Sequence, residues 1–373
     1  MRKIAILCGR YLPGYKDGGP LRTVVNICEC LGEEYSIRII TNDRDHGDDK
    51  PYPNIIYDAP NKVGNAEVWY LPPKCFTKKR LIQLIKDVDV VYCCGPYDDY
   101  ARNVMWLKKK NKFSQPLVIA SMGVFSAGAL KLKKIKKRLY FFICKLLGLF
   151  RNVAWSVTSE KEEYDVKKNI GKKAVCYVAE DLPRKVPKAI EKKANDEKRG
   201  VFISRICEMK NLMYALDVLK EVKSPLWFDV YGVIEDKEYW EKCQIAIKEL
   251  PSNIKCEYKG DAEPEKVIQI FSEYDFFLFP TLGENYGHVI FESLAGKCIP
   301  IISDQTPWTD LLEKEVGVVA SLKEKQSFIN AVEEMCLLNV EQLREKQNKA
   351  KAYAEEKYEQ TLNNTGYRKI FEL

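Results

Sequence analysis

The stretch from Asp275 to Glu292 constrains the fold of this chain more than any other. Residues 275–279 are apolar enough to form a buried strand of a parallel sheet, and Pro280 ends that strand because a proline cannot donate to a sheet ladder. A polar loop with glycines follows, and apolar residues then recur at helical spacing until Gly296, which is placed to end a helix. Since open α/β sheets bind ligands at the carboxyl ends of their strands, this loop is a candidate binding site.

Two carboxylates, Glu284 and Glu292, lie in the loop and in the first turns of the predicted helix. The start of a helix presents free N–H groups and a partial positive charge, which suit a diphosphate, whereas a carboxylate accepts hydrogen bonds from hydroxyl groups. A ligand that carries both phosphates and a sugar or ribose diol would use both features. The alternative is an ordinary solvated loop and helix, because charged residues are mostly exposed. The apolar strand and helix around the two carboxylates favour the binding site.

The balance of charge and the cysteines exclude several classes of protein. The chain carries 60 basic and 53 acidic residues, and the net charge of +7 is too modest at 373 residues to indicate a nucleic acid partner. The 13 cysteines form no CxxC pair, and an odd number without a secretory signal is typical of reduced thiols in a cytosolic protein. The apolar run at the N-terminus is too short for a signal peptide and predicts a first strand.

Metal ligands are scarce in this sequence. Only two histidines occur, His46 and His288, so a metal site built from several histidines is excluded. The acidic motif Asp43-Arg44-Asp45 resembles a short metal-binding sequence, but it lies in a polar loop that is rich in Asp and Lys. We therefore predict neither a metal site nor a cofactor.

Alternating strands and helices in the first half predict a doubly wound parallel sheet. The strands are expected at residues 3–8, 37–41, 88–93, 117–121, 153–158 and 174–178, and the clearest helices at 79–86 and 102–110. A loop with Gly14, Gly18 and Gly19 lies between the first strand and an apolar helix, an order that brings the backbone close to a phosphate or a sugar. The loop matches neither the dinucleotide fingerprint nor the P-loop, and the alternative is a flexible turn.

A second alternating half follows residues 183–199, a segment with prolines and many charges that predicts a linker. Its strands are expected at residues 201–204, 227–231, 254–258, 275–279, 299–303 and 316–320, and the chain ends in a long helical region with a bend at Tyr358. We therefore predict an α/β protein with two Rossmann-like domains, residues 1–182 and 200–355, that face a cleft. A C-terminal helix at residues 356–373 is expected to pack back on the first domain.

Three motifs follow one another along these predicted strands: Gly18-Gly19, then Arg205 with Lys210, then Glu284 and Glu292 with Gly287 between them. In this order they resemble the retaining glycosyltransferases of family 4, also called glycosyl transferases group 1. The resemblance covers nearly the whole chain and is strongest from Val201 to Val319. It implies the GT-B fold, in which two doubly wound parallel-sheet domains bind the acceptor and the nucleotide sugar respectively.

The resemblance also implies a role for each motif residue. The donor would be bound by Gly18, Gly19, Arg205, Lys210, Asn285, Tyr286, Gly287, His288 and Glu292, and the chemistry would be carried by Glu284, Arg205 and Lys210. Glu292 would bind the ribose hydroxyls and Glu284 the donor sugar, where it could also stabilise an oxocarbenium-like centre. His288 would hydrogen-bond the sugar or the phosphate, or else it is a packed residue.

Arg205 and Lys210 follow the carboxyl end of a predicted strand. Two cations there would stabilise the negative charge that a departing diphosphate gains, and they would make a divalent metal unnecessary. The alternative is that they pair with Glu208 and Asp217. Some members of the resembled family carry a catalytic histidine where the segment 121–123 stands here without one, so the base stays unassigned.

Residues 131–150 combine six basic residues in 131–138 with an apolar run that is too short to span a bilayer. Basic residues beside aromatic and leucine residues suit an interfacial helix on anionic lipid, with Phe141 and Phe142 adding apolar burial. The alternative is a core helix with a solvated basic end.

We therefore predict a cytoplasmic retaining glycosyltransferase, peripheral at the inner face of the membrane. It would move a sugar from a nucleoside-diphosphate sugar to a hydroxyl of a glycan or lipid-linked glycan, in the assembly of a cell-surface polysaccharide or glycolipid. The alternatives are a nucleotide-sugar epimerase or phosphorylase of the same fold, or a non-catalytic sugar-nucleotide-binding or membrane-scaffold protein. The residues do not specify the donor, the acceptor or the linkage.

Overall fold

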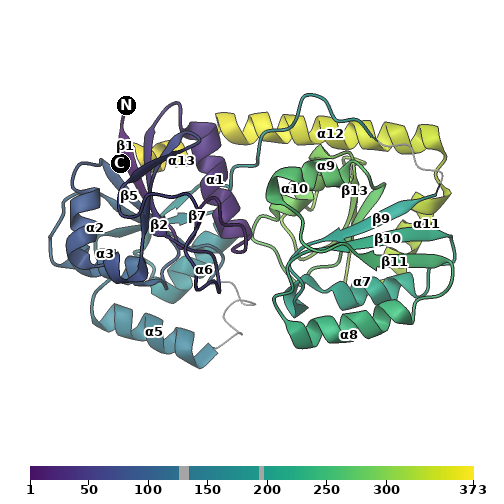
Figure 1. Ribbon diagram of the computed structural model, residues 1–373, viewed down its shortest axis with the longest axis horizontal. Helices are drawn as coiled ribbons and strands as arrows, with labels where there is room; N and C mark the ends of the chain where they lie inside the picture. Colours follow the sequence, from purple (N-terminus) through teal and green to yellow (C-terminus); the bar gives the residue numbers. More distant parts are fainter. Residues whose placement is uncertain (126–133, 193–196) are drawn as a thin grey trace. The chain divides into compact units, whose positions relative to one another are not determined.

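The chain forms two compact units, each an α/β domain with its own sheet (Figure 1). The computed structural model describes residues 1–125, 134–192 and 197–373. Unit 1 comprises Met1–Arg184 together with Thr361–Leu373, and unit 2 comprises Lys185–Gln360. The α/β fold class with two parallel-sheet domains, predicted from the sequence, is confirmed.

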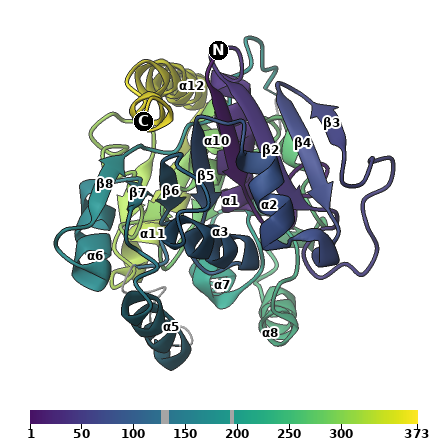
Figure 2. The same cartoon turned by 90° about the vertical axis from the view of Figure 1, so that its left-hand side faces the viewer.

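The sheet of unit 1 has eight strands: β1 (Lys3–Leu7), β2 (Ser36–Asn42), β3 (Pro60–Val63), β4 (Ala66–Leu71), β5 (Val90–Cys94), β6 (Leu117–Ala120), β7 (Val153–Val157) and β8 (Val175–Val178). Their order is β3-β4-β2-β1-β5-β6-β7-β8, and every neighbouring pair is parallel except β3 with β4 (Figure 2). Strands β5 and β6 are wholly buried. Strands that helices cover on both faces have continuous apolar sequences. This is why β5 and β6 could be predicted from the sequence.

Strands β3 and β4 were not predicted from the sequence. They form an antiparallel hairpin in which Val63 pairs with Ala66 across Gly64 and Asn65. Gly64 has φ 54°, the left-handed conformation that a two-residue hairpin turn requires. Strand β3 begins with Pro60 and lies at the edge of the sheet, the position where a strand tolerates proline.

Helices cover both faces of this sheet. Helix α1 (Gly19–Leu31) and the C-terminal helix α13 (Tyr367–Phe371) contribute to the core on one face. The core on the other face includes residues of α2 (Lys78–Ile85), α3 (Asp99–Lys109), α5 (Lys134–Leu146) and α6 (Glu160–Ile170). The ring of Phe371 lies 5.3 Å from that of Tyr35 and Tyr367 lies 6.1 Å from Tyr92, so the last residues of the chain are part of unit 1.

The sheet of unit 2 has six parallel strands: β9 (Arg199–Ile203), β10 (Leu226–Tyr231), β11 (Ile254–Tyr258), β12 (Phe276–Phe279), β13 (Ile299–Ser303) and β14 (Val318–Ala320). Their order is β11-β10-β9-β12-β13-β14. The helices are α7 (Leu212–Leu219), α8 (Lys237–Lys248), α9 (Val267–Phe271), α10 (His288–Ala295), α11 (Lys325–Leu337) and α12 (Val340–Asn363). The predicted bend at Tyr358 is wrong, because α12 continues to Asn363.

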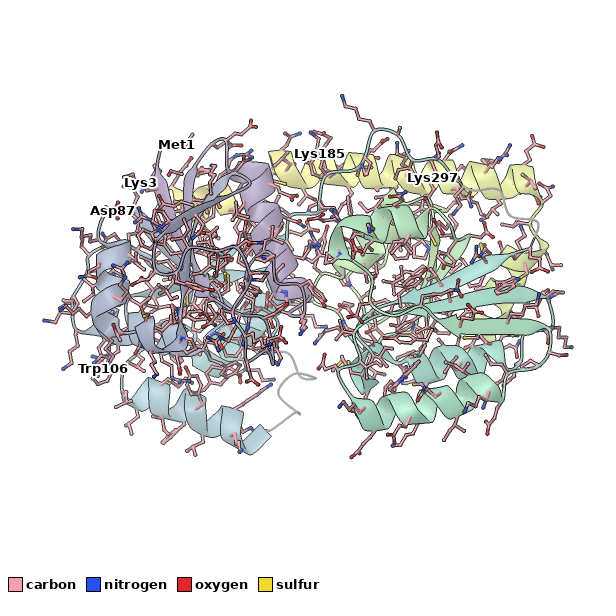
Figure 3. All side chains as sticks on the ribbon, in the orientation of Figure 1. Met1, Lys3, Asp87, Trp106, Lys185 and Lys297 are labelled. Carbon is pink, nitrogen blue, oxygen red and sulfur yellow. The ribbon has the colours of Figure 1, made fainter. Side chains whose placement is uncertain are left out.

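Each sheet has a topological switch point, where consecutive strands depart to opposite sides. The switch point lies between β1 and β5 in unit 1 and between β9 and β12 in unit 2. Ligands of open α/β sheets bind outside the carboxyl ends of the strands at such points. In unit 1, Lys3 and Asp87 form a 3.7 Å ion pair at the opposite, amino edge (Figure 3).

Candidate active site

The loop after β12 is fixed to the loop after β9, across the switch point of unit 2. The N–H of Leu282 donates to the carbonyl of Met209 at 2.9 Å, and the Asn211 amide donates to the carbonyl of Pro280 at 2.9 Å. Asn211 has φ 60°, a left-handed conformation that asparagine tolerates better than most residues. These bonds hold two segments that are about seventy residues apart in the sequence side by side, and the sequence alone gave no sign of them.

Lys210 and Glu284 meet at this junction. The Lys210 Nζ lies 2.5 Å from the Glu284 Oε1, and the two side chains are only 13% and 11% exposed. The buried Thr281 hydroxyl lies 3.2 Å from the same carboxylate oxygen and 3.1 Å from the Met209 carbonyl. The Lys210 ammonium also lies 5.7 Å from the centre of the Phe279 ring. The structure thus fixes one cation and one carboxylate at the carboxyl ends of β9 and β12.

Arg205 is nearby in sequence but differently placed. Its guanidinium hydrogen-bonds to Glu235, and the two side chains are 39% and 48% exposed. The alternative prediction, that the two cations pair with Glu208 and Asp217, is wrong, since the partners are Glu235 and Glu284.

Helix α10 begins directly after Gly287, which has φ 83°. A Cβ at Gly287 would lie 3.0 Å from Ile290 Cδ1, so the residue is fixed both by its backbone conformation and by packing. The buried Tyr286 ring packs 4.8 Å from the His288 ring and 5.5 Å from Trp308, and the indole donates to the Tyr286 carbonyl at 2.5 Å. These contacts anchor the first turn of the helix.

Glu292 is buried on α10, and Asn285 is exposed in the loop ahead of it. The His288 ring is only partly buried. The structure therefore brings the predicted residues Glu284 and Lys210 into contact in unit 2, and residues 285–292 follow in the loop and in α10.

Gly18 and Gly19 lie in unit 1, where Gly18 has φ 62° and precedes α1. A Cβ at Gly19 would meet no atom within 4 Å. The backbone at the start of α1 is thus locally open, as the approach of a ligand requires, and packing does not explain this glycine.

The switch point of unit 1 carries a pocket of about 280 Å³ that the sequence did not predict. It is lined by Arg10, Asn42, Pro73, Phe76, Tyr97, Asp98, Asp99, Tyr100 and Arg102. Among the described residues, neither the Arg10 Nε nor the Tyr97 hydroxyl has a hydrogen-bond partner, although both atoms are buried. Nearby, burial raises the pKa of Asp17 even though Arg10 lies 3.9 Å away. The pocket offers donors and acceptors suited to a polyhydroxylated ligand.

The acidic motif at residues 43–45 serves the local fold. The Asp45 carboxylate accepts from the backbone N–H of Tyr15 at 2.8 Å and of His46 at 2.8 Å, while Asp43 pairs with Arg44. Within residues 1–125, 134–192 and 197–373, no group of three or more His, Cys, Asp or Glu side chains is arranged to hold a metal ion.

Residues 183–357 match the model of a family described as glycosyl transferases group 1. The matched region includes the Lys210–Glu284 pair, Arg205 and Glu292. No curated protein matches the chain in sequence.

Solved structures resemble the chain over nearly its full length. Sucrose-phosphate synthase from Thermosynechococcus elongatus has a TM-score of 0.71 at 15% identity, with 100% of both chains covered. HepE of Anabaena in complex with UDP-glucose has a TM-score of 0.71 at 14% identity, with the same coverage. An alpha,alpha-trehalose-phosphate synthase (UDP-forming) from Burkholderia vietnamiensis has a TM-score of 0.67 at 10% identity, covering 97% of this chain and 95% of that one. At these identities the likeness establishes the fold, GT-B.

Proposed function

We propose that the protein is a retaining glycosyltransferase of family 4, because residues 183–357 match the glycosyl transferases group 1 model. It moves a sugar from a nucleoside-diphosphate sugar to an acceptor hydroxyl. The bond between the anomeric carbon and the phosphate oxygen breaks, the nucleoside diphosphate leaves with the electron pair, and the acceptor oxygen bonds to the same carbon. The observation that carries the proposal is the Lys210–Glu284 pair, which lies at the switch point of a parallel sheet.

Lys210 is the proposed electrostatic group for the leaving diphosphate. An ammonium has three N–H donors, and one of them is used by Glu284, so the others can reach phosphate oxygens. The charge on these oxygens grows as the bond breaks, so a fixed cation stabilises the transition state more than the ground state.

Arg205 is the second proposed cation. Its pairing with the exposed Glu235 is worth only about 0–1 kcal/mol, so a diphosphate can replace Glu235 at little cost. A bidentate guanidinium–phosphate contact is stronger than such a surface pair. Because two cations then face the diphosphate, we propose that transfer needs no divalent metal.

The remaining motif residues are assigned to the donor. Glu292 binds the ribose hydroxyls and Glu284 the sugar, since ionised carboxylates accept hydrogen bonds from hydroxyl groups. The backbone around Gly287 and the start of α10, with Asn285, Tyr286 and His288, receives the sugar and phosphate. Gly18 and Gly19 of unit 1 are also assigned to donor binding, since a Cβ at Gly19 would meet no atom within 4 Å.

We assign the acceptor to unit 1, in the pocket around Arg10, Asp98 and Tyr100. Its unpartnered buried donors suit the hydroxyl oxygens of a glycan. The departing diphosphate is a base of the right charge to take the proton of the attacking hydroxyl. Ser121, near the expected position of a histidine, is buried and its hydroxyl donates to the Ser156 carbonyl at 3.1 Å, and we assign it no role as the base.

A lipid-linked acceptor is supported by α5. No helix in the described part of the chain is long and apolar enough to cross a bilayer. The outer face of α5 nevertheless exposes Leu139, Phe142, Ile143 and Leu146 beside basic residues. The expectation that Phe141 contributes to this face is wrong, because it packs in the core 4.8 Å from Phe125. Residues 131–133 of the predicted segment lie outside the described residues. We propose that this face rests on an anionic inner membrane surface, within the cytoplasm.

Thermal stabilisation by a panel of nucleotide sugars tests the proposal. A UDP-, GDP- or ADP-sugar at one hundred times its dissociation constant adds about 2.7 kcal/mol to the unfolding free energy. We expect one nucleotide to stabilise the protein and to be slowly hydrolysed without acceptor, which a purely binding protein would not do. No stabilisation by any of the three classes contradicts the proposal.

A further inference from the structure

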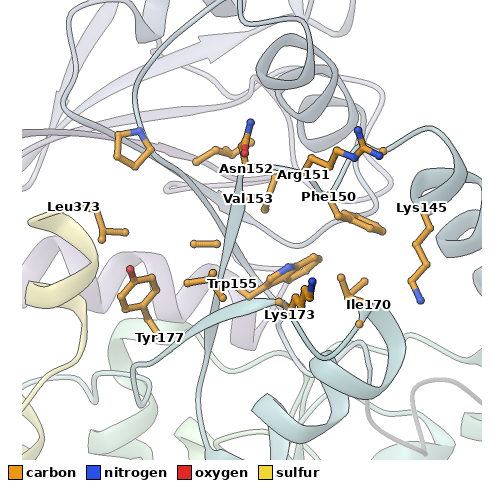
Figure 4. Close-up of a pocket in the computed structure, with 17 residues that line it drawn as sticks. Lys145, Phe150, Arg151, Asn152, Val153, Trp155, Ile170, Lys173, Tyr177 and Leu373 are labelled. Carbon is orange, nitrogen blue, oxygen red and sulfur yellow. The ribbon is translucent and has the colours of Figure 1, made fainter.

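A pocket of about 730 Å³ opens in unit 1 at the amino edge of the sheet, opposite to the edge that carries the proposed acceptor pocket (Figure 4). Leu117, Val153 and Val175, the first residues of β6, β7 and β8, line it. Its volume lies within the range of about 300–1,000 Å³ that is usual for sites of small organic ligands.

Three basic side chains line this pocket, Lys145, Arg151 and Lys173, and no acidic side chain does. They come from the last turn of α5 and from the loops that precede β7 and β8. All three are exposed, and none forms an ion pair with any residue that the structure describes. Positive charge gathered over one cavity, with no acidic side chain in its lining, favours an anionic ligand group.

The rest of the lining is largely apolar and aromatic. The half-buried Phe150 lines the pocket with its ring centre 5.5 Å from that of Trp155, which is fully buried behind it, and the half-buried Ile170 lies near them (Figure 4). Val175 on the edge strand β8 is 53% exposed. A small inorganic anion would leave this apolar surface in water, so the pocket fits a ligand that joins an anionic group to an alkyl chain.

The pocket adjoins the outer face of α5. Lys145 lines the pocket and is followed by Leu146, which is 76% exposed on the apolar face. Gly148, two residues further on, lines the pocket again. A lipid at the outer face of α5 would therefore lie beside the lining of this pocket.

We propose that this pocket binds one molecule of an anionic lipid. The phosphate lies among Lys145, Arg151 and Lys173, and one alkyl chain lies over Phe150, Ile170 and Val175. The site is separate from the proposed transfer site, and its occupancy does not depend on glycosyltransferase activity.

Calorimetric titration with alkyl phosphates, kept below their micelle concentrations, tests the chemistry of the ligand. We expect octyl phosphate to bind with one site per chain, and each CH₂ removed from its chain to weaken binding by up to about fourfold. Inorganic phosphate, glucose 6-phosphate and octyl trimethylammonium should bind at least tenfold more weakly. If inorganic phosphate or glucose 6-phosphate bound as tightly as octyl phosphate, the pocket would be a site for a soluble phosphorylated compound. If octyl trimethylammonium bound as tightly, the three cations would have no role in recognition. Either result would overturn the proposal.

Charge variants test the location. The triple variant Lys145→Glu, Arg151→Glu and Lys173→Glu should weaken octyl phosphate binding more than tenfold, since each lost charged hydrogen bond is worth at least that much. A control with the same change in net charge is Lys50→Glu, Lys62→Glu and Lys79→Glu, three exposed lysines of unit 1 outside the pocket. The control should bind like the wild type.

A third variant separates the pocket from the apolar face of α5. Phe142→Ser with Leu146→Ser should keep the affinity for monomeric octyl phosphate within about threefold. Unchanged binding by the charge-reversed triple variant, or loss of binding in this α5 variant while its circular dichroism is unchanged, would show that the ligand does not occupy the pocket. Neither readout uses turnover, so these outcomes leave the proposed function intact.

Discussion

Single residues of the candidate site differ in how much the fold depends on them. The Lys210–Glu284 pair is nearly buried, whereas Arg205 and Glu235 are exposed. We expect Arg205→Ala to change the unfolding free energy by less than about 1 kcal/mol. Lys210→Ala leaves the Glu284 carboxylate without its cation and should destabilise the protein by about 3–5 kcal/mol. Denaturant unfolding of both variants measures the difference.

The control for this comparison is the double variant Lys210→Ala with Glu284→Gln. It removes the stranded charge, so it should be more stable than Lys210→Ala alone. Equal stability of the single and double variants would show that Glu284 is solvated and that the pair is not buried in solution.

Asp181 couples the stability of unit 1 to pH. Burial, reinforced by the charge of Glu162, raises the pKa of Asp181 to about 7, and the Tyr367 hydroxyl lies 3.3 Å from its carboxylate. The native state therefore holds a proton that the unfolded chain releases near its ordinary pKa. The stability from this group is complete below that ordinary pKa and is lost as pH rises through about 7.

The expected loss approaches about 1.4 kcal/mol per pH unit below the native pKa, or roughly 2 kcal/mol in all from about pH 5 to about pH 7. The Asp181→Asn variant has no ionisable group at this position. Between about pH 5 and about pH 7, its unfolding free energy should therefore not show the loss that Asp181 causes in the wild type. Denaturant melts at several pH values provide the measurement. Parallel curves for the two proteins would mean that Asp181 is ionised in the native state.

At the scale of elements, the start of α10 depends on one glycine. Gly287→Ala places a Cβ 3.0 Å from Ile290 in a left-handed backbone, and should destabilise the protein by about 1–2 kcal/mol. Gly283→Ala is the matched control, because a Cβ there meets nothing within 4 Å. If the two variants unfold alike in denaturant, the tight turn before α10 is not formed as described.

Helix α5 is the element proposed to meet the membrane. Phe142 and Leu146 are 64% and 76% exposed, so Phe142→Ser with Leu146→Ser should abolish most sedimentation with anionic vesicles. Leu312→Ser with Leu337→Ser changes two exposed leucine residues of unit 2 and should have no effect.

The basic residues of α5 allow a second test of the proposed contact between this helix and the membrane. Lys136→Glu with Arg138→Glu should weaken vesicle binding, because each basic residue near an anionic surface contributes about 1 kcal/mol. Added salt should weaken the wild type in the same way. If vesicle binding by the wild type depended neither on the charge of the lipid nor on the salt concentration, the proposed membrane role of α5 would be contradicted.

For the whole molecule, the sequence predicted most of the strands of the two sheets. It also predicted the motifs that lie in residues 183–357, the region that matches the family model. Strands such as β5 and β12 are buried on both faces, and their unbroken apolar runs made them visible. The β3–β4 hairpin was missed because a short strand that begins with Pro60 carries almost no such signal. The bend at Tyr358 was wrong because nothing in the local sequence shows that α12 continues past it.

The candidate site was predictable only in part. Lys210 and Glu284 were each selected from motifs, but their contact depends on the adjacency of β9 and β12, which no local pattern encodes. The pocket around Arg10 and Tyr100 combines residues at or beyond the carboxyl ends of β1, β2, β4 and β5, so it appears only when the strand order is known. Glu235 was missed for the same reason, because it reaches Arg205 from beyond β10.

The most direct test of the central claim is the release of nucleoside diphosphate from the stabilising donor by wild type and Arg205→Ala, at saturating donor and in the presence of a chelator. We expect the wild type to turn over without metal, and Arg205→Ala to be slower by about 10²–10³ while its unfolding is nearly unchanged. Near-wild-type turnover by Arg205→Ala, or wild-type activity that vanishes in chelator and returns with magnesium or manganese, would contradict that claim.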